Sequence, residues 1–391
     1  MNLNYGDFYN LIPLADKETK ATNLEHEAKA VFKLFSFGVS TNRDEWVYDL
    51  NLNDLSFKIE LLSNIYNQQI QDITKNSWSS QQANTFLDYS IKWSESLKSN
   101  ANNIKKVIFN KENIVSANYR PYFKTFYYTD FIFSDRLTSI HTQLFGKKCD
   151  QKNLTICLTV HQQVPFVVQA TDCLFDAGLG SRGTQGLSLY RYDKKGNRMD
   201  NITDWGLAQF QTRYNNSTIS KLDIFHYTYA VLHNPAYRTK YELKLKQEFP
   251  RIPFYDDFHQ WVNWGKQLMD LHINYETVQP YPLKRIDLPL ATNRTPKAKL
   301  KADITKGTII LDDVTTLEGV PQIAWEYRLG NRCALEWILD QYKEKKPKDP
   351  TIAEKFNTYS FADYKEQVID LLQRVCTVSV ETMQIIQQIE V

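Results

Sequence analysis

Three short runs in the middle of the sequence decide the fold class: LTICLTV (residues 154–160), VPFVVQA (164–170) and LSLYRY (187–192). They are rich in β-branched and aromatic residues and are bounded by Gly, Pro, Asp or Lys, which is typical of β-strands. Together with their surroundings they predict a mixed β region over residues 118–212. In the stretches on both sides, the apolar residues recur at helical spacing instead.

Before this region, the apolar residues of 24–37 recur at helical spacing, and residues 54–72 predict a second helix. Residues 76–112 are polar and indicate a surface helix or spacer, with an apolar stripe of Phe86, Tyr89, Trp93 and Leu97. In the first of these segments, residues 24–37, the apolar residues at helical spacing are Ala28, Val31, Phe32 and Phe35.

After it, residues 216–276 predict three helices, the second of which begins at Pro235. Residues 281–307 indicate strands and loops with seven basic and two acidic residues. Two further helices are expected near 335–342 and 364–375. The sequence therefore predicts an α+β fold, with a mixed central β region, a helical N-terminal segment and a helical C-terminal half.

Composition restricts the function classes. Of 391 residues, 42% are hydrophobic, which is ample for a buried core, and 47 basic against 45 acidic residues leave a net charge of only +2. Any contact with nucleic acid must therefore depend on local basic patches. The five cysteines include no C-x-x-C pair, which disfavours a disulfide framework or a zinc site and favours a reducing cytoplasm. We expect neither an export signal nor a membrane span.

Four motifs with possible chemistry have plainer explanations. GLGSRG (178–183) fits a nucleotide or S-adenosylmethionine loop, but such a loop needs a following helix, and a strand-like run follows here. NPAY (234–237) resembles the N-P-P-[YFW] tetrapeptide of amino-group methyltransferases, but it falls between two helical runs. His226 and His233 lack a third metal ligand, and ELK (242–244) lacks the upstream Pro-Asp of a nuclease site.

The basic features fit nucleic acid better. RYDKKGNR (191–198) predicts a hairpin tip suited to phosphates, with a solvated turn as the alternative. NYRPYFKTFYY (118–128) surrounds Arg120 with aromatic residues, most of which we expect in the core. Lys345, Lys346 and Lys348 fit either a solvated helix exit or a phosphate contact.

Seven motifs together resemble the C-terminal part of type ISP restriction-modification enzymes, the single-polypeptide relatives of type I systems, from about residue 20 to the end. They occur in the order seen in that family: GVSTNRDEWVYD (38–49), NYRPY (118–122), NITDWGLAQFQ (201–211), IFHYTYAVLHNPAYRTKY (224–241), FPRIPF (249–254), WEYRLGNRCALEWILDQYKEK (325–345) and VCTVSVETMQIIQQIE (375–390).

Complete members of that family join a nuclease, a translocating ATPase, a coupling segment, an adenine-N6 methyltransferase and a C-terminal target-recognition domain. The resemblance implies that this chain is the last of these, with a joining segment at its start. No Walker loop, N-P-P-[YFW] or convincing cofactor loop is present, so the chain is expected to be a truncated product or a separately encoded specificity component. S-adenosylmethionine, ATP and Mg²⁺ are then expected only in the missing domains.

The resemblance further implies that the chain directs adenine-N6 methylation and cleavage by reading double-stranded DNA beside a methyltransferase domain or subunit, without catalysing either step alone. Two alternatives stay open: an orphan methyltransferase that uses GLGSRG and NPAY in degenerate form, and a docking module that does not read DNA. We expect residues 1–75 to link to the methyltransferase, 76–215 to form the β-rich recognition region and 216–391 to form a mainly helical scaffold.

Residues that read bases should vary between family members with different targets, so the stereotyped motifs are poor candidates. Arg328 and Arg332 flank a Gly330-Asn331 turn that is expected to be structural, with Asn331 capping the next helix. The candidate DNA contacts at less stereotyped positions are Lys147, Lys148, Arg182, Gln185, Lys194, Lys195 and Arg198, with Arg191 of the same hairpin. Arg120, which lies within the NYRPY motif, is one further candidate.

Overall fold

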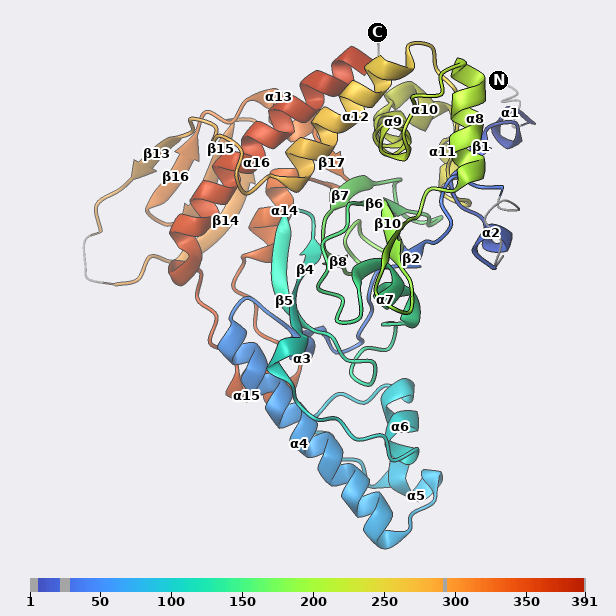
Figure 1. Cartoon of the computed structure of the whole chain (residues 1–391). Helices are drawn as coiled ribbons and strands as arrows, with labels where there is room; N and C mark the ends of the chain where they lie inside the picture. The colour runs from blue at the N-terminus through green and yellow to red at the C-terminus, as the bar shows by residue number, and fades with distance from the viewer. Residues whose placement is uncertain (1–5, 22–28, 291–293, 390–391) are drawn as a thin grey trace.

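The computed structural model describes residues 6–21, 29–290 and 294–389. Within these ranges, three four-stranded sheets lie beside long helices, so the predicted α+β class is confirmed (Figure 1). No helix in the described part of the chain is long and apolar enough to cross a membrane.

The central sheet has the strand order β2–β9–β6–β7 and is antiparallel throughout. Its side chains alternate between two cores, because Ile156 and Leu158 pack with the helices while Cys157 packs on the opposite side. Burial on both faces explains why the sequence shows continuous apolar runs instead of alternation. The strands are β2 (Ser36–Phe37), β6 (Thr155–Thr159), β7 (Val168–Thr171) and β9 (Thr184–Ser188).

A second sheet, of order β3–β5–β4–β8, packs against the face of the central sheet that carries Cys157. The two sheets approach closely at Gly186, where a Cβ atom would lie 2.5 Å from the ring of Phe175. A side chain larger than hydrogen would therefore push the sheets apart. The strands are β3 (Tyr48–Asp49), β4 (Ile114–Arg120), β5 (Phe123–Tyr128) and β8 (Leu174–Phe175), with a short 3₁₀ turn at Lys111–Asn113.

Residues 52–102 form a helical arm that extends away from the sheets (Figure 1). Helix α4 (Leu52–Asn76) begins at Asn51, whose side chain caps Asn53 and Asp54, and confirms the predicted helix. The stripe predicted over 86–97 does not form one helix, because α5 (Ser80–Thr85) and α6 (Glu95–Asn102) are separate and Phe86 is 59% exposed between them.

The predicted helix over 24–37 is wrong for its described part. Residues 29–37 contain no helix: the chain bends at residues 30, 31 and 33, Val31 donates its N–H to the Pro13 carbonyl, Phe32 bridges Ile202, and the segment ends in β2. Val31, Phe32 and Phe35 are all buried, and a non-helical run buried on both sides can imitate helical spacing. Ala28 lies outside the described residues. The start of the chain also holds α1 (Gly6–Tyr9), β1 (Ile12–Pro13), α2 (Lys17–Ala21) and, later, α3 (Asp44–Val47).

A layer of helices covers the other face of the central sheet, with α9, α12 and α16 side by side (Figure 1). Helices α9 and α12 cross closely, since a Cβ atom at Gly265 would lie 1.8 Å from the His226 carbonyl oxygen. The predicted helices and the break at Pro235 are confirmed. The layer consists of α8 (Asp204–Tyr214), α9 (Lys221–His233), α10 (Pro235–Lys240), α11 (Glu242–Leu245), α12 (Phe258–Ile273) and α16 (Phe361–Ile389), and β12 (Arg251–Ile252) pairs with β1.

The basic segment near residue 300 forms an edge of the third sheet, of order β13–β16–β15–β14. A tight hairpin, β17–β18, then precedes α14. The predicted cap at Asn331 is wrong, because the N-cap of α14 is Cys333, whose Sγ accepts the Glu336 N–H. These elements are β13 (Lys284–Asp287), β14 (Ala298–Asp303), β15 (Thr308–Asp312), β16 (Thr315–Glu318), α13 (Gln322–Glu326), β17 (Arg328–Leu329), β18 (Arg332–Cys333), α14 (Ala334–Gln341) and α15 (Pro350–Lys355).

Long-range packing joins the three ranges expected as units. One buried cluster contains Phe8, Ile156, Phe225 and Ile389, so the start, middle and end of the chain share a core. A shared core does not test where one unit ends and the next begins, and the boundaries expected near residues 75 and 215 stay predictions.

Candidate nucleic-acid interface

The candidate DNA contacts divide between the two ends of the central sheet. Strands β6 and β9 pair Thr159 with Thr184 at one end and Thr155 with Ser188 at the other, roughly 14 Å away at ~3.4 Å per residue. We call the first the loop end, made of residues 160–167, 177–183 and 328–333. We call the second the hairpin end, made of residues 146–153 and 190–200.

The hairpin end carries the predicted tip, and the hairpin itself is confirmed. β10 (Tyr190–Tyr192) and β11 (Arg198–Asp200) pair antiparallel, and the Asp193 carboxylate accepts the N–H groups of Lys195 and Asn197 across the turn. The Asn197 side-chain amide also donates to Asp193 at 2.9 Å, and this bond, together with the backbone bonds, lowers the pKa of Asp193. Lys194 and Lys195 are exposed at the tip.

Two arginines lie along the flanks of this hairpin. The guanidinium of Arg198 lies 4.3 Å above the Tyr190 ring, and Arg191 Nε donates to the Asp200 carbonyl at 3.0 Å. Both contacts hold the stems of these side chains against the ribbon. The hairpin thus presents its cations on a narrow, exposed projection.

Lys147 and Lys148 belong to the same end of the sheet. They follow α7 (Ser139–Phe145), and the Asn153 side chain donates to both Leu144 and Tyr190 carbonyls, which ties α7 to the hairpin. Both lysines are exposed, and Lys148 pairs with Glu112 at 2.6 Å. Such a surface pair is screened by salt and gives way easily to another anion.

The loop end brings together three segments that are far apart in sequence. A Cβ atom at Gly330 would lie 3.6 Å from the Val167 side chain and 4.0 Å from the Gly180 carbonyl oxygen, and one at Gly183 would lie 3.7 Å from the His161 ring. Gly330 has φ +75, which the two-residue β17–β18 turn requires. The three loops therefore form one continuous surface.

Exposed hydrogen-bonding side chains cover this surface. Arginine can donate two bonds to guanine O6 and N7, and glutamine or asparagine can pair with adenine N6 and N7. The Arg328 guanidinium donates to the Asn331 carbonyl across the hairpin turn and lies 3.9 Å from a Glu336 carboxylate oxygen, and the side chain is exposed. The exposed residues here are Gln162, Gln163, Arg182, Arg328 and Asn331.

Arg120 lies beneath the loop end, with a side chain that is 20% exposed. Its Nη1 contacts Asp176 Oδ1 at 2.7 Å and the Tyr119 carbonyl at 2.5 Å, and its guanidinium stacks 3.8 Å above the Tyr119 ring. The same Asp176 oxygen accepts the Gly178 N–H at 2.7 Å, which anchors the glycine-rich loop. Arg120 therefore has a structural partner in place, and its contact with DNA stays a prediction.

Burial sets the electrostatics of this ion pair. Desolvation raises the pKa of Asp176 to about 6, although the nearby Arg120 opposes the rise. Tyr48 donates to the second carboxylate oxygen at 3.3 Å. A Cβ atom at Gly178 would lie 2.9 Å from Arg120 Nη1, so the loop passes directly over the pair.

Gln185 is placed differently from its neighbour Arg182. It lies in β9, pairs with Leu158 and Phe37, and is only 6% exposed. In this arrangement its side chain belongs to the sheet, whereas Arg182 stands on the loop. Its role as a base contact stays a prediction. Such a contact would require the strand to move.

The structure gives GLGSRG and NPAY the plainer explanations. GLGSRG runs directly into β9, so no helix N-terminus faces it. Asn234 of NPAY caps α10 by accepting the N–H groups of Ala236 and Tyr237. Among the described residues, no group of three or more His, Cys, Asp or Glu side chains could hold a metal ion.

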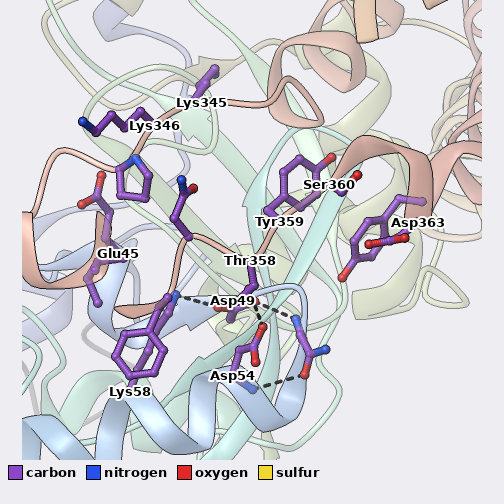
Figure 2. A pocket seen from close by; sticks show the side chains of 16 residues that line it. Glu45, Asp49, Asp54, Lys58, Lys345, Lys346, Thr358, Tyr359, Ser360 and Asp363 are labelled. Carbon is purple, nitrogen blue, oxygen red and sulfur yellow. Dashed lines mark hydrogen bonds and ion pairs between the residues drawn. The ribbon is translucent and has the colours of Figure 1, made fainter. Parts of the chain in front are cut away.

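The lysine run after α14 lies at the edge of a cavity of about 430 Å³ between α3, α4 and residues 345–360 (Figure 2). The Glu45 carboxylate accepts the N–H groups of Lys348 at 2.9 Å and Asp349 at 2.8 Å, so this segment is fastened to α3. Asp49, Asp54 and Asp363 line the cavity together with Lys58, Lys345 and Lys346, and Lys58 pairs with Asp49 at 2.6 Å. The lining is therefore mixed in charge, and a phosphate contact of the lysine run stays a prediction.

These features define a recognition domain, in which loops on a rigid sheet present exposed hydrogen-bond donors and cations. The chain belongs to the family of Type ISP C-terminal specificity domains, whose model matches residues 30–371. The family resemblance seen in the sequence is thereby confirmed.

Solved structures are similar over 98% of this chain. They include a DrdV–DNA complex (44% identity, TM-score 0.89), a nuclease-deletion mutant of the Type ISP enzyme LlaGI with a DNA substrate mimic (29%, 0.81) and the ATP-dependent Type ISP enzyme LlaBIII bound to DNA (25%, 0.79). This chain covers 38%, 34% and 24% of theirs, respectively. No curated protein matches the sequence.

Proposed function

We propose that this chain selects the DNA target of a Type ISP restriction-modification enzyme by binding a short asymmetric site in double-stranded DNA. The observation that carries this proposal is the match of 98% of the chain, at TM-scores of 0.79 to 0.89, to enzymes solved with DNA or a DNA mimic. The loop end supplies donors for base edges, and the hairpin end supplies cations for phosphates.

In this proposal, adenine-N6 methylation and DNA cleavage are performed by other domains, which bind S-adenosylmethionine, ATP and Mg²⁺. The relatives are more than twice as long as this chain, which leaves room for those domains. A methyltransferase domain or subunit is the protein partner. The five free cysteines support work in the reducing cytoplasm.

The test is a salt titration of duplex binding by the purified chain, joined to selection from random-sequence DNA. We expect steep loss of affinity with salt and recovery of one asymmetric motif. Binding of S-adenosylmethionine by the chain alone would favour the orphan methyltransferase. Absence of DNA binding at about 50 mM salt, where phosphate contacts are strong, would contradict recognition by this chain alone and favour a docking module.

A further inference from the structure

A small cavity of about 230 Å³ opens beside the loop end. Its walls come from β7, from the junction of α9 and α10, from the β17 hairpin and from α16, and they include Val168, His233, Arg238 and Arg328. Arg328 belongs to both the cavity and the loop end. The cavity therefore adjoins the surface that we propose to read bases.

Arg238 is a partly buried cation without an acidic partner among the described residues. Its Nε donates to the Leu232 carbonyl at 2.5 Å, and its guanidinium lies 5.8 Å from the ring of Phe166, a loop-end residue. Desolvation lowers the pKa of Arg238 to about 10, and the groups that oppose this lowering are tyrosine hydroxyls, not carboxylates. A desolvated charge in this position is costly unless an anion pairs with it.

His233 is a second polar group of the cavity that the protein leaves incomplete. Its side chain is 2% exposed, and its Nδ1 bonds with the Tyr229 carbonyl at 2.8 Å. Its Nε2 is buried and has no hydrogen-bond partner in the described part of the chain. Because Nδ1–H donates to the carbonyl and burial lowers the pKa of His233, the neutral ring leaves Nε2 as an acceptor. This atom therefore calls for a hydrogen-bond donor such as water in the cavity, and it makes no contact with a phosphate oxygen.

We propose that this cavity binds one phosphate group of the DNA backbone, held by Arg238 and by Arg328 at the rim; the inference rests on the proposed function. A guanidinium fork can make two parallel bonds to phosphate oxygens, and the low-dielectric surroundings strengthen them. Phosphate contacts fix the register of a protein on the duplex. A phosphate held here would fix the bases that Arg182 and Gln162 face.

Glu326 lines the same cavity and is exposed. Its carboxylate repels a bound phosphate, so a substitution at Glu326 should change DNA binding in the opposite sense to one at Arg238. Removing the charge of Arg238 should weaken DNA binding, whereas removing the charge of Glu326 should strengthen it.

The experiment uses the full chain and a duplex that carries the selected target, with a neutral methylphosphonate replacing one phosphate at a time. We expect one position at which this replacement weakens binding about tenfold, as for the loss of a charged hydrogen bond. Arg238→Gln should weaken binding to the unmodified duplex by a similar factor. In that variant the penalty at this one position should vanish, while penalties at other positions remain.

Two further variants separate this site from general effects. Arg213→Gln removes another arginine that lies 5.9 Å from a phenylalanine ring, Phe254, and should leave the position-specific penalty in place. Glu326→Gln should tighten binding severalfold and increase that penalty. If Arg238→Gln fails to fold, Arg238→Lys keeps the charge without the fork and should reduce the penalty in part.

The outcomes distinguish the two proposals. Normal DNA binding by Arg238→Gln, with every methylphosphonate penalty retained, would overturn the phosphate site and leave target recognition standing. Failure of the unaltered chain to bind any duplex would overturn the proposed function of the chain alone, and the phosphate site with it.

Discussion

The loop end and the hairpin end of the central sheet carry similar polar side chains but hold them in different ways. The loop end is assembled from residues 160–167, 177–183 and 328–333, which touch through Gly330, and the buried Arg120–Asp176 pair lies beneath it. The hairpin end projects as a two-stranded ribbon, and a Cβ atom at Gly196 would meet nothing within 4 Å.

This difference suits the two kinds of DNA contact. Hydrogen bonds to base edges require fixed distances and angles, so the side chains that make them need rigid support. Phosphate contacts are less directional and tolerate an exposed, adjustable ribbon. We therefore expect changes at the loop end to alter which sequence is bound, and changes at the hairpin end to alter how strongly any sequence is bound.

The largest expected effect is on the support of the loop end. Arg120→Met leaves the Asp176 carboxylate buried, with 6% of its side chain exposed and no cation beside it. We expect the free energy of unfolding at pH 7.5 to fall by about 3 kcal/mol, as for other broken buried pairs. Urea unfolding measures the loss. The double variant with Asp176→Asn should lose less than Arg120→Met alone.

The loss should depend on pH. Burial raises the pKa of Asp176 to about 6, so the folded state binds this proton more tightly than the unfolded state, whose pKa is ~4. Protonation therefore stabilises the fold as pH falls from 6 towards 4, and a neutral Asp176 no longer needs Arg120. The effect of Arg120→Met should be smaller at pH 5 than at pH 7.5. Equal losses at both values would contradict this explanation.

The next effect is on sequence choice at the loop end. Arg182→Ala should relax selection at one target position by about 1–3 kcal/mol, because one bidentate base contact is lost. Selection from random-sequence DNA measures the change. Arg182→Lys is the matched control: it keeps the charge and should lose most of the discrimination but little of the salt dependence. If Arg182→Ala leaves the recovered motif unchanged, Arg182 does not contact the bases of the target.

A smaller effect is expected for charges of the hairpin end. Replacing Lys194 and Lys195 together by alanine should reduce the steepness of the log–log salt dependence by about 2, since each phosphate contact contributes roughly 0.9. The recovered motif should stay the same. A changed motif would show that the hairpin reads bases, and the contrast between the two ends would be wrong.

The smallest effect is expected for the hairpin turn itself. Gly196 has φ +86, so Gly196→Ala should disfavour the turn by about 1 kcal/mol through backbone strain alone. Hydrogen exchange of the amides of β10 and β11 should speed up severalfold while global unfolding changes little. Gly180→Ala, whose new Cβ atom would lie 2.8 Å from a Thr159 methyl group, should instead lower global stability.

Local patterns predicted much of the fold. The helices α4, α9, α12, α14 and α16 follow from the spacing of their apolar residues, and the runs 154–160 and 164–170 overlap β6 and β7. The run 187–192 does not form one strand, because the structure divides it between the end of β9 and β10, which lie in different sheets. Residues 29–37 misled the prediction because their burial comes from partners such as Ile202, which no local window contains. The strand position of Gln185 escaped notice in the same way, because a glycine-rich loop and a buried strand meet within three residues there.

The candidate site was predictable only in part. The hairpin and its cations are contiguous in sequence, so the basic residues and the turn residues of 191–198 were sufficient to predict them. The loop end depends on contacts between residues about 150 positions apart, and Gln162, Gln163 and Asn331 were therefore missed as a group. Arg328 was predicted to have a structural role, and Arg120 was predicted as a candidate DNA contact without any indication that it pairs with Asp176.

The assembly of the loop end also limits how a specificity could be transplanted between relatives. A graft of residues 160–183 from a homologue would arrive without the Gly330 turn that its backbone rests against, and a graft of residues 328–333 alone would meet a foreign glycine-rich loop. Exchange of both segments in one step keeps the matched pair. Recombination or engineering that alters the target should therefore succeed with paired segments more often than with either piece alone.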